Sequence, residues 1–465
     1  MTQPEPCDAL IIGTGQAGKP LAGALAKAGW RVVVVEKGRV GGTCVVEGCT
    51  PTKTMVASAR VAHLARRARD YGVHAGEVTV DLAAVRARKR AIVDAWSGSS
   101  ERGLTKHDTL ELVPGVARFT GPRAVSVHDA ETDGEGVPAR RFAAEHVFIN
   151  AGTRTRIPDL PGLDRVPYLT STSIMELAEV PEHLIVLGGG FIGLEFGQMF
   201  RRFGAAVTIV EGGARLVARE DEDVSDALAD ILRDEGIDLR LDTPAERVGV
   251  GPDGGIALHL EGGDTVLGSH LLVAIGRRSN ADGLGLEHTG LEPDARGFIP
   301  VDDRCRTGVE NVWALGDITG APPFTHISYD DYRVVESQLL GDGSVTRAGR
   351  LLPYVMFTDP QLGRVGLTEA DARKQGRDIR VAKLPMERVA RAVETDETRG
   401  FMKAVVDAGT DRVLGAAILG IEGGEVMSVL QMAMVADLPF TALRDGVFAH
   451  PTLAESLNNL FLALE

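Results

Sequence analysis

Two cysteines with a short spacing are the residues of this sequence that most directly indicate chemistry. Cys44 and Cys49 lie in the segment GGTCVVEGCTPTK, with four residues between them. That spacing is about one turn of a helix, so both sulfur atoms could lie on one helix face. Such a pair can be a redox-active dithiol, one half of a metal site, or two small buried hydrophobic residues.

A metal site built on this pair would need further ligands at a similar spacing. The other two cysteines, Cys7 and Cys305, are isolated in the sequence, and no pair of histidines completes a ligand set near Cys44 and Cys49. No resident metal is therefore expected, and a dithiol that exchanges electrons is favoured.

Two glycine-rich turns provide the setting for these cysteines. The first follows the apolar stretch 8–12, opens a helical pattern and leads to the valine-rich stretch 31–36, which ends on an acid. The second repeats this order in residues 184–211, with its acid at the same distance from the first glycine. The residues are Gly13, Gly15, Gly18 and Glu36 in the first copy, and Gly188, Gly190, Gly193 and Glu211 in the second. A strand, such a turn, a helix and a second strand form a dinucleotide-binding module, so two dinucleotides are expected.

The rest of the sequence indicates a third, different part. Residues 56–110 have a helical pattern rich in Arg and Ala, and residues 113–149 have the pattern of a small sheet. From about residue 351, strand-like stretches alternate with an amphipathic helical pattern, without a nucleotide-binding turn. We therefore predict an α/β fold with two Rossmann-like dinucleotide-binding domains and a C-terminal α+β dimerisation domain.

The overall composition argues against several classes of partner. The 465 residues carry a formal net charge of −15, and nucleic-acid binding needs a basic surface. No run of about 18 apolar residues indicates a membrane span, and the N-terminal residues lack the basic region of a secretory signal. Four cysteines are too few for a disulfide framework. We therefore expect a cytoplasmic protein that binds neither nucleic acid nor membranes.

The acid that closes each module indicates which nucleotides bind. Glu36 and Glu211 can accept hydrogen bonds from a ribose, and a carboxylate would repel a 2′-phosphate. The second site is therefore expected to take NADH. NADPH is the alternative, because Arg215 follows Glu211 by four residues and could meet a phosphate. A solvated loop charge is the simpler interpretation of Arg215.

The block GGTC-x4-C-x-PTK resembles the pyridine nucleotide-disulfide oxidoreductase family, which includes dihydrolipoamide dehydrogenase, glutathione reductase and mercuric reductase. The resemblance extends from about residue 7 to the C-terminus and implies FAD in the first module. It implies that Cys49 faces the flavin as a thiolate and that Cys44 exchanges electrons with the acceptor. It also implies that Lys53 lies near the flavin and pairs with Glu195.

Further motifs resemble cofactor-binding segments of the same family, at 115–117, 151–153, 274–277 and 313–317. The remaining cofactor contacts implied in this way are Gly42, Thr43, Gly115, Ala117, Ala151, Gly152, Thr153, Gly276, Arg277, Gly316 and Asp317. The implied domains are an FAD-binding domain at 1–150 and 277–345, an NAD(P)-binding domain at 151–276, and an interface domain at 346–465.

Near the C-terminus, His450 and Glu455 stand in the segment HPTLAE. A carboxylate five residues after a histidine, near a helix start, can bond one ring nitrogen and raise the basicity of the imidazole. The His-Pro-Thr-x-x-Glu signature belongs to the same family, in which the partner subunit supplies this pair as acid and base. The resemblance therefore implies a homodimer with an active site shared between subunits.

Within the family, the segments GTGQAGKPLA, LVAREDEDVSDALADILRDEGIDL and HPTLAESLNNLF resemble mercuric-reductase-like flavoproteins, which include the reactive-chlorine-resistance copper reductase. This implies that electrons from NADH pass through FAD and the Cys44–Cys49 disulfide to a metal ion, a quinone or a small disulfide. Dihydrolipoamide dehydrogenase is the alternative, although Val46 stands where that enzyme commonly has Asn. Further alternatives are a mercuric reductase, whose C-terminal cysteine pair has no counterpart in this sequence, and a flavin-based redox or metal sensor.

Overall fold

The computed structural model describes residues 3–130 and 137–464. The chain forms two compact units, each assembled from segments that are far apart in sequence. The first comprises residues 1–54, 84–156 and 276–350, and the second comprises residues 55–83, 157–275 and 351–465. The second unit therefore holds most of both segments predicted as the NAD(P)-binding and interface domains, and the boundary between those two domains stays a prediction.

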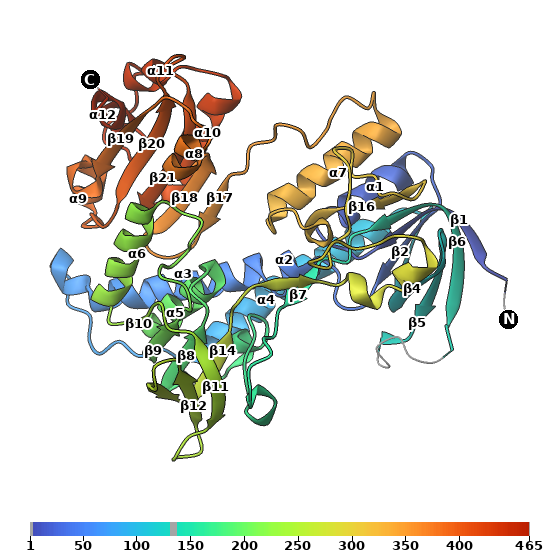
Figure 1. Ribbon diagram of the computed structural model, residues 1–465, viewed down its shortest axis with the longest axis horizontal. Coiled ribbons are helices and arrows are strands. Elements are labelled where there is room, and N and C mark those ends of the chain that lie inside the picture. The colour runs from blue at the N-terminus through green and yellow to red at the C-terminus, as the bar shows by residue number, and fades with distance from the viewer. Residues whose placement is uncertain (1–2, 131–136, 465) are drawn as a thin grey trace. The chain divides into compact units, whose positions relative to one another are not determined.

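A seven-stranded sheet forms the centre of the first unit (Figure 1). The strand order is β3-β2-β1-β6-β5-β4, with β16 paired to β6. Its strands are β1 (Glu5–Ile12), β2 (Val32–Glu36), β3 (Leu110–Pro114), β4 (Val116–Gly121), β5 (Ala124–His128), β6 (Arg140–Ile149) and β16 (Val312–Ala314). The pairs that join β3, β2, β1, β6 and β16 are parallel, whereas β5 pairs antiparallel with both β6 and β4. The small sheet predicted at 113–149 is thus part of the module's own sheet, because β6 pairs directly with β1.

Helices cover this sheet and explain its apolar strands. Leu25 of α1 (Gly18–Lys27) and Val334 of α7 (Thr325–Leu340) are buried together with Ile11 of the sheet. Parallel strands that are buried on both faces have continuous apolar sequences, which accounts for the run of valines in β2. A separate antiparallel pair is formed in this unit by β7 (Thr153–Thr155) and β15 (Arg277–Ser279).

The continuous helical region predicted for residues 56–110 is interrupted. α3 (Cys49–Arg66) is followed by a 3-10 turn (Ala68–Tyr71), residues 72–81 are not helical, and α4 spans Leu82–Thr105. The stretch 72–81 contains two glycines and several β-branched residues, which are poor helix formers. The prediction was therefore wrong over that stretch.

The second unit contains a parallel sheet in the order β10-β9-β8-β14. Its strands are β8 (His183–Leu187), β9 (Ala206–Val210), β10 (Asp238–Arg240) and β14 (His270–Val273), with helices α5 (Phe191–Phe203) and α6 (Glu222–Asp234). An antiparallel sheet accompanies it, formed by β11 (Ala245–Val250), β12 (Ile256–Leu260) and β13 (Thr265–Gly268). One buried apolar cluster joins the two sheets. The turn between β8 and α5 is the second glycine-rich turn, as the repeat in the sequence predicts.

The C-terminal part of the second unit is an antiparallel sheet in the order β17-β18-β21-β20-β19 with helices packed against it (Figure 1). The strands are β17 (Tyr354–Met356), β18 (Gln361–Gly366), β19 (Ile379–Pro385), β20 (Phe401–Asp407) and β21 (Val413–Gly420). The helices are α8 (Glu369–Lys374), α9 (Ala390–Glu394), α10 (Gly423–Val435), α11 (Phe440–Arg444) and α12 (Ser456–Leu462). Apart from α8, these elements contribute to one apolar core. The predicted α/β fold with two nucleotide-binding modules and a C-terminal α+β domain is confirmed.

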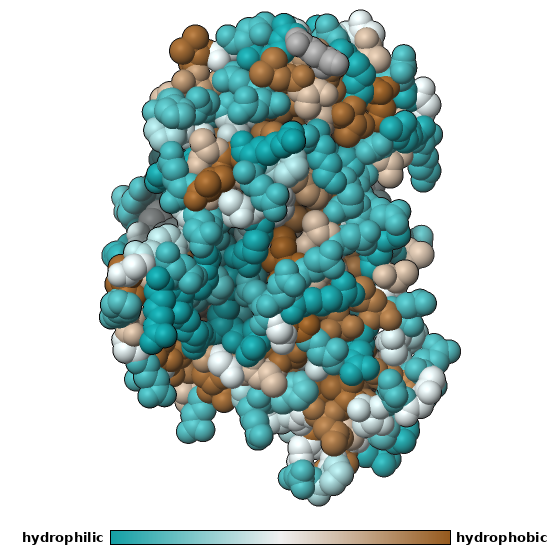
Figure 2. Space-filling view, turned by 90° about the vertical axis from the view of Figure 1, so that its left-hand side faces the viewer, coloured by the Kyte–Doolittle hydropathy of each residue, from teal (hydrophilic) through white to brown (hydrophobic). Residues whose placement is uncertain are grey.

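Hydrophilic residues predominate on the face in Figure 2, and hydrophobic patches are scattered among them. Within the ranges 3–130 and 137–464, no helix is long and apolar enough to cross a membrane.

Candidate redox site and nucleotide-binding turns

The first glycine-rich turn packs so closely on its surroundings that side chains would not fit. Gly13 donates its N–H to Val35 at 2.8 Å and has a φ of 98°. A Cβ on Gly13 would lie 2.5 Å from the carbonyl oxygen of Asn150, and one on Gly18 would lie 2.4 Å from the carbonyl oxygen of Gly13. The backbone at the start of α1 is therefore bare, as an approaching pyrophosphate requires.

The second turn repeats this geometry. Gly188 donates to Val210 at 2.8 Å and has a φ of 118°, and a Cβ on it would lie 2.6 Å from the carbonyl oxygen of Ala274. A Cβ on Gly193 would lie 2.1 Å from the carbonyl oxygen of Gly188. Both cradles thus have the bare backbone that a dinucleotide needs, which fits FAD in the first module and a nicotinamide nucleotide in the second.

The closing acids also make matching hydrogen bonds. Glu36 accepts from the N–H of the second residue of its turn at 2.8 Å and from the N–H two residues after itself at 2.9 Å. Glu211 makes the same two bonds at 2.6 Å and 2.7 Å. These bonds fix each carboxylate beside its glycine-rich turn. Its oxygens keep further lone pairs that can accept a hydrogen bond from a ribose hydroxyl.

The start of α2 (Gly42–Val46) lies against the first turn. Gly42 has a φ of 65°, and a Cβ on it would lie 2.6 Å from the Cα of Gly15. Gly41 donates its N–H to the Thr14 hydroxyl at 3.0 Å and accepts from the Gln16 side chain at 3.1 Å. These contacts place Thr43 and Cys44, the next residues of α2, beside the turn predicted to hold FAD.

Cys44 and Cys49 hydrogen-bond to each other, but they do not share a helix. Cys44 lies in α2, and Cys49 is the first residue of α3. The expectation of one shared helical turn was therefore wrong. Pro51 lies in the first turn of α3, and its ring would clash with a helical carbonyl four residues earlier, at Glu47, where α2 ends. Within the described residues, neither Cys44 nor Cys49 forms a disulfide.

The two thiols lie in different surroundings. Cys49 is exposed, and its sulfur lies 3.3 Å from the Thr325 hydroxyl. Cys44 is less exposed, and its hydrogen bond with Cys49, followed by burial, raises its pKa above the usual range. A second negative charge is disfavoured beside the first, so Cys44 remains a thiol when Cys49 is a thiolate.

Three of the predicted cofactor residues form a hydrogen-bonded group. Arg277 donates from Nε to the Thr153 hydroxyl at 2.7 Å and from Nη2 to the Thr153 carbonyl at 2.7 Å. The Thr153 hydroxyl also bonds Asp317 at 3.2 Å. Burial raises the pKa of Asp317, and the nearby Arg277 guanidinium opposes that rise. Sequence segments more than a hundred residues apart thus meet at one place in the first unit.

Six further predicted cofactor residues lie in the same unit: Gly115, Ala117, Ala151, Gly152, Gly276 and Gly316. Gly115 donates its N–H to the carbonyl of Glu36 at 2.9 Å, beside the closing acid. The Asn280 side chain bonds the carbonyl of Ala151 at 2.7 Å, and its N–H bonds the carbonyl of Gly152 at 3.2 Å. These contacts position the backbone, and the roles of these residues toward a cofactor stay predictions.

Lys53 and Glu195 lie in different units, on α3 and α5, and their pairing stays a prediction. Glu195 is buried, and its Oε1 accepts the backbone N–H of Phe357 at 2.8 Å. The carboxylate is therefore oriented by the loop that follows β17.

His450 and Glu455 lie together at the start of α12. Nδ1 of His450 lies 3.0 Å and 2.9 Å from the two carboxylate oxygens of Glu455. The imidazole is largely exposed. A carboxylate on Nδ1 fixes the tautomer and leaves Nε2 directed outward for proton transfer.

Sequence reasoning missed two residues that hold backbone of the predicted cofactor motifs in place. The buried Asn150 accepts from Gly18 N–H at 2.9 Å and donates to the Leu315 carbonyl at 2.9 Å. Asp331, fully buried on α7, accepts the N–H of Gly316 at 2.9 Å. The sequence Asn-Ala-Gly-Thr contains Asn150 directly before a predicted motif, but Asp331 has no comparable signal.

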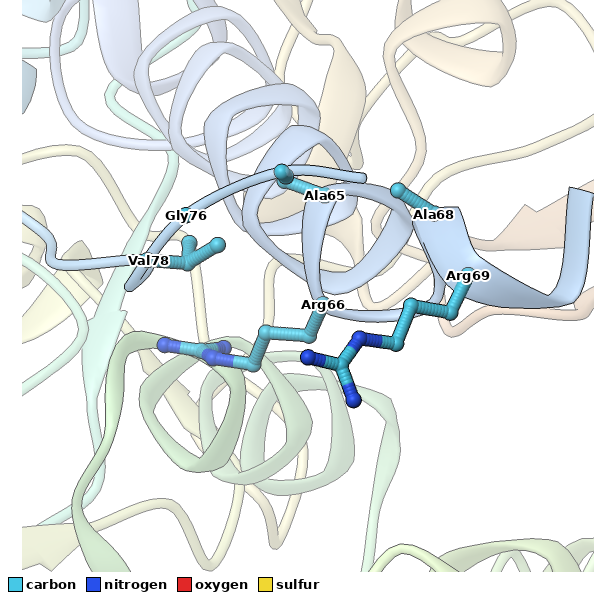
Figure 3. A pocket seen from close by; sticks show the side chains of 7 residues that line it. Ala65, Arg66, Ala68, Arg69, Gly76 and Val78 are labelled. Carbon is cyan, nitrogen blue, oxygen red and sulfur yellow. The ribbon is translucent and has the colours of Figure 1, made fainter. Parts of the chain in front are cut away.

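A cavity of about 340 Å³ lies in the second unit, at the end of α3. Arg66 and Arg69 are among the residues that line it, and their side chains extend in roughly the same direction (Figure 3). None of the residues that line it is a predicted site residue.

The comparison with protein families agrees with this geometry. Residues 7–331 match the pyridine nucleotide-disulphide oxidoreductase family, and residues 352–461 match its dimerisation domain. The chain therefore belongs to the pyridine nucleotide-disulphide oxidoreductases. It is an FAD- and NAD(P)H-dependent flavoprotein disulfide oxidoreductase.

Two relatives and one solved structure place the chain within the family. It is 39% identical to the probable pyridine nucleotide-disulfide oxidoreductase RclA of Escherichia coli, over 97% of this chain and 98% of that one. It is 36% identical to a mercuric reductase of Streptomyces lividans, over 97% and 94%. The Cu(II) complex of the HOCl-induced flavoprotein disulfide reductase RclA from E. coli matches with a TM-score of 0.90 and 38% identity, over 98% of this chain and 100% of that one.

Proposed function

We propose that this enzyme passes electrons from NADH, through FAD and the Cys44–Cys49 pair, to a metal ion, with a quinone or a small disulfide as other acceptors. Cu(II) is the acceptor to test first, because the similar E. coli RclA was solved as a Cu(II) complex. The observation that carries the proposal is the hydrogen-bonded cysteine pair, tied through Gly42 to the first nucleotide turn. FAD, when bound, takes two electrons from the nicotinamide and passes them on.

The two sulfurs have separate roles in this proposal. The Cys44–Cys49 disulfide takes up two electrons and two protons and becomes a dithiol. Two Cu(II) ions then take one electron each, which restores the disulfide and releases two Cu(I) ions and the two protons. Cys49, exposed beside Thr325, is assigned to the flavin side and Cys44 to the acceptor. The raised pKa of Cys44 means that its exchange needs a base.

His450, held by Glu455, is proposed to be that base, acting on Cys44 of the other subunit in a homodimer. The imidazole is exposed, with Nδ1 occupied by the carboxylate. The dimerisation domain also exposes several large apolar side chains, as an interface would: Met432, Val435, Leu438, Val447 and Leu462. We place the enzyme in the cytoplasm, where a dithiol is kept reducible.

A steady-state acceptor panel tests the proposal. Purified FAD-loaded enzyme is mixed with NADH and Cu(II), Hg(II), a benzoquinone, lipoamide or oxidised glutathione, and NADH oxidation is followed. Turnover with Cu(II) that the Cys44→Ser variant loses supports the proposal, and that variant also controls for direct reaction of NADH with the metal. Lipoamide turnover well above that of every other acceptor would instead identify a dihydrolipoamide dehydrogenase.

A further inference from the structure

Arg215 follows the closing acid of the second module, and its partly exposed guanidinium is paired with two carboxylates. It donates from Nη2 to the carboxylate of Glu222, and its Nε lies 3.7 Å from the carboxylate of Asp226. Glu222 is the first residue of α6, and Asp226 lies one turn further along that helix. Two carboxylates of one helix thus hold the guanidinium.

Arg215 lies close to Glu211, the residue predicted to bind the ribose, because Gly213 lies beside both. A Cβ on Gly213 would lie 3.2 Å from Oε1 of Glu211 and 4.0 Å from the carbonyl oxygen of Arg215. The backbone of Arg215 is therefore near the carboxylate predicted to bind the ribose, well within the length of an arginine side chain. A 2′-phosphate at that ribose would need a cation to offset Glu211, and a nearby arginine is the usual one.

We propose that Glu222 and Asp226 hold Arg215 away from the 2′-phosphate position and thereby set the preference for NADH over NADPH. The inference rests on the proposed function only in requiring that the second module binds NAD(P)H. All three side chains are partly exposed, and each exposed ion pair is weak, so release of both is expected to change the selectivity by about 3- to 10-fold.

The test measures binding rather than turnover. The FAD-loaded Glu222→Gln/Asp226→Asn double variant is titrated calorimetrically with adenosine 2′,5′-bisphosphate and with 5′-AMP, and the ratio of the two affinities is compared with wild type. The ratio should shift toward the bisphosphate by about 3- to 10-fold and should shift less at high salt, because surface ion pairs are screened. The ratio of kcat/KM for NADPH to that for NADH should move in the same direction.

Two further variants show whether Arg215 carries the effect. Adding Arg215→Ala to the double variant should abolish the gain. Asp230→Asn, which removes the partner of Arg233 at 3.2 Å on the same helix, should leave the ratio unchanged. Provided that 5′-AMP still binds, two results would overturn the inference. One is a ratio of bisphosphate to 5′-AMP affinity that is unaltered in the double variant, and the other is a gain in that ratio that persists when Arg215→Ala is added. If wild type binds neither 5′-AMP nor NADH, the proposed function itself fails.

Discussion

Replacing Asn150 with alanine should weaken FAD binding strongly, although Asn150 lies 132 residues after Gly18 of the nucleotide turn in the sequence. Its side chain bonds Gly18 N–H and the Leu315 carbonyl, both at 2.9 Å and both buried. A buried polar group that loses its partner costs about 1–3 kcal/mol. At roughly 1–2 kcal/mol for each of the two groups, the substitution leaves about 2–4 kcal/mol uncompensated.

Apoprotein can relieve this cost by local loosening of the turn, whereas bound FAD would hold the turn in its native geometry. The cost should therefore appear in binding, as a dissociation constant about 30- to 700-fold higher at 1.4 kcal/mol per factor of ten. The assay is equilibrium titration of apoprotein with FAD, followed by flavin fluorescence, alongside denaturant unfolding of the same samples.

Asn458→Ala is the matched control. Its side-chain amide bonds the carbonyls of Leu443 at 2.7 Å, Arg444 at 3.0 Å and Gly446 at 3.0 Å in the dimerisation domain. That variant should lose stability without losing FAD affinity. Wild-type FAD affinity in Asn150→Ala would refute the reasoning, as would an equal loss of affinity in both variants.

The remaining predictions concern proton transfer and pH. His450→Ala should lower dithiol-dependent turnover by about 10²- to 10⁴-fold, while reduction of bound flavin by NADH in stopped flow keeps its wild-type rate; equal slowing of both steps would contradict the assignment. The dithiol-dependent turnover of Glu455→Gln should lie between that of wild type and that of His450→Ala. Burial, then Arg202, lowers the pKa of His63 from 6.5 to about 4. Because the folded pKa lies below the unfolded one, the stabilisation is complete above about pH 6.5 and is lost as the pH falls toward 4. Urea midpoints measured from pH 4 to pH 7 should depend less on pH in His63→Gln, and an unchanged pH profile would exclude this histidine as a cause.

The sequence was sufficient to predict what local patterns encode. Both nucleotide turns and the approach of His450 to Glu455 depend on residues within one module or one turn. Glycines in a repeated strand–turn–helix order have one main physical use, so the pattern was specific.

The parts that sequence reasoning missed depend on residues brought together by tertiary packing. Thr325 lies 276 residues after Cys49 in the sequence, yet it contacts the Cys49 sulfur. Asp331, in the same helix α7 as Thr325, accepts the N–H of Gly316. Neither Thr325 nor Asp331 stands at a spacing in the sequence that would identify it as a site residue. The break between α2 and α3 was different, because Pro51 could have revealed it: a proline in a first turn excludes a helical residue four places earlier.

Titration of the FAD-loaded enzyme with NADH tests the central claim most directly. If Cys49 is the thiolate beside the flavin and Cys44 faces the acceptor, a long-wavelength absorption band should form in wild type when NADH reduces the disulfide. The band should be present in Cys44→Ser before NADH is added, because no disulfide ties up Cys49, and it should be absent from Cys49→Ser. A band that persists in both variants, or forms in neither wild type nor Cys44→Ser, would contradict the assignment of the cysteine pair as the electron relay.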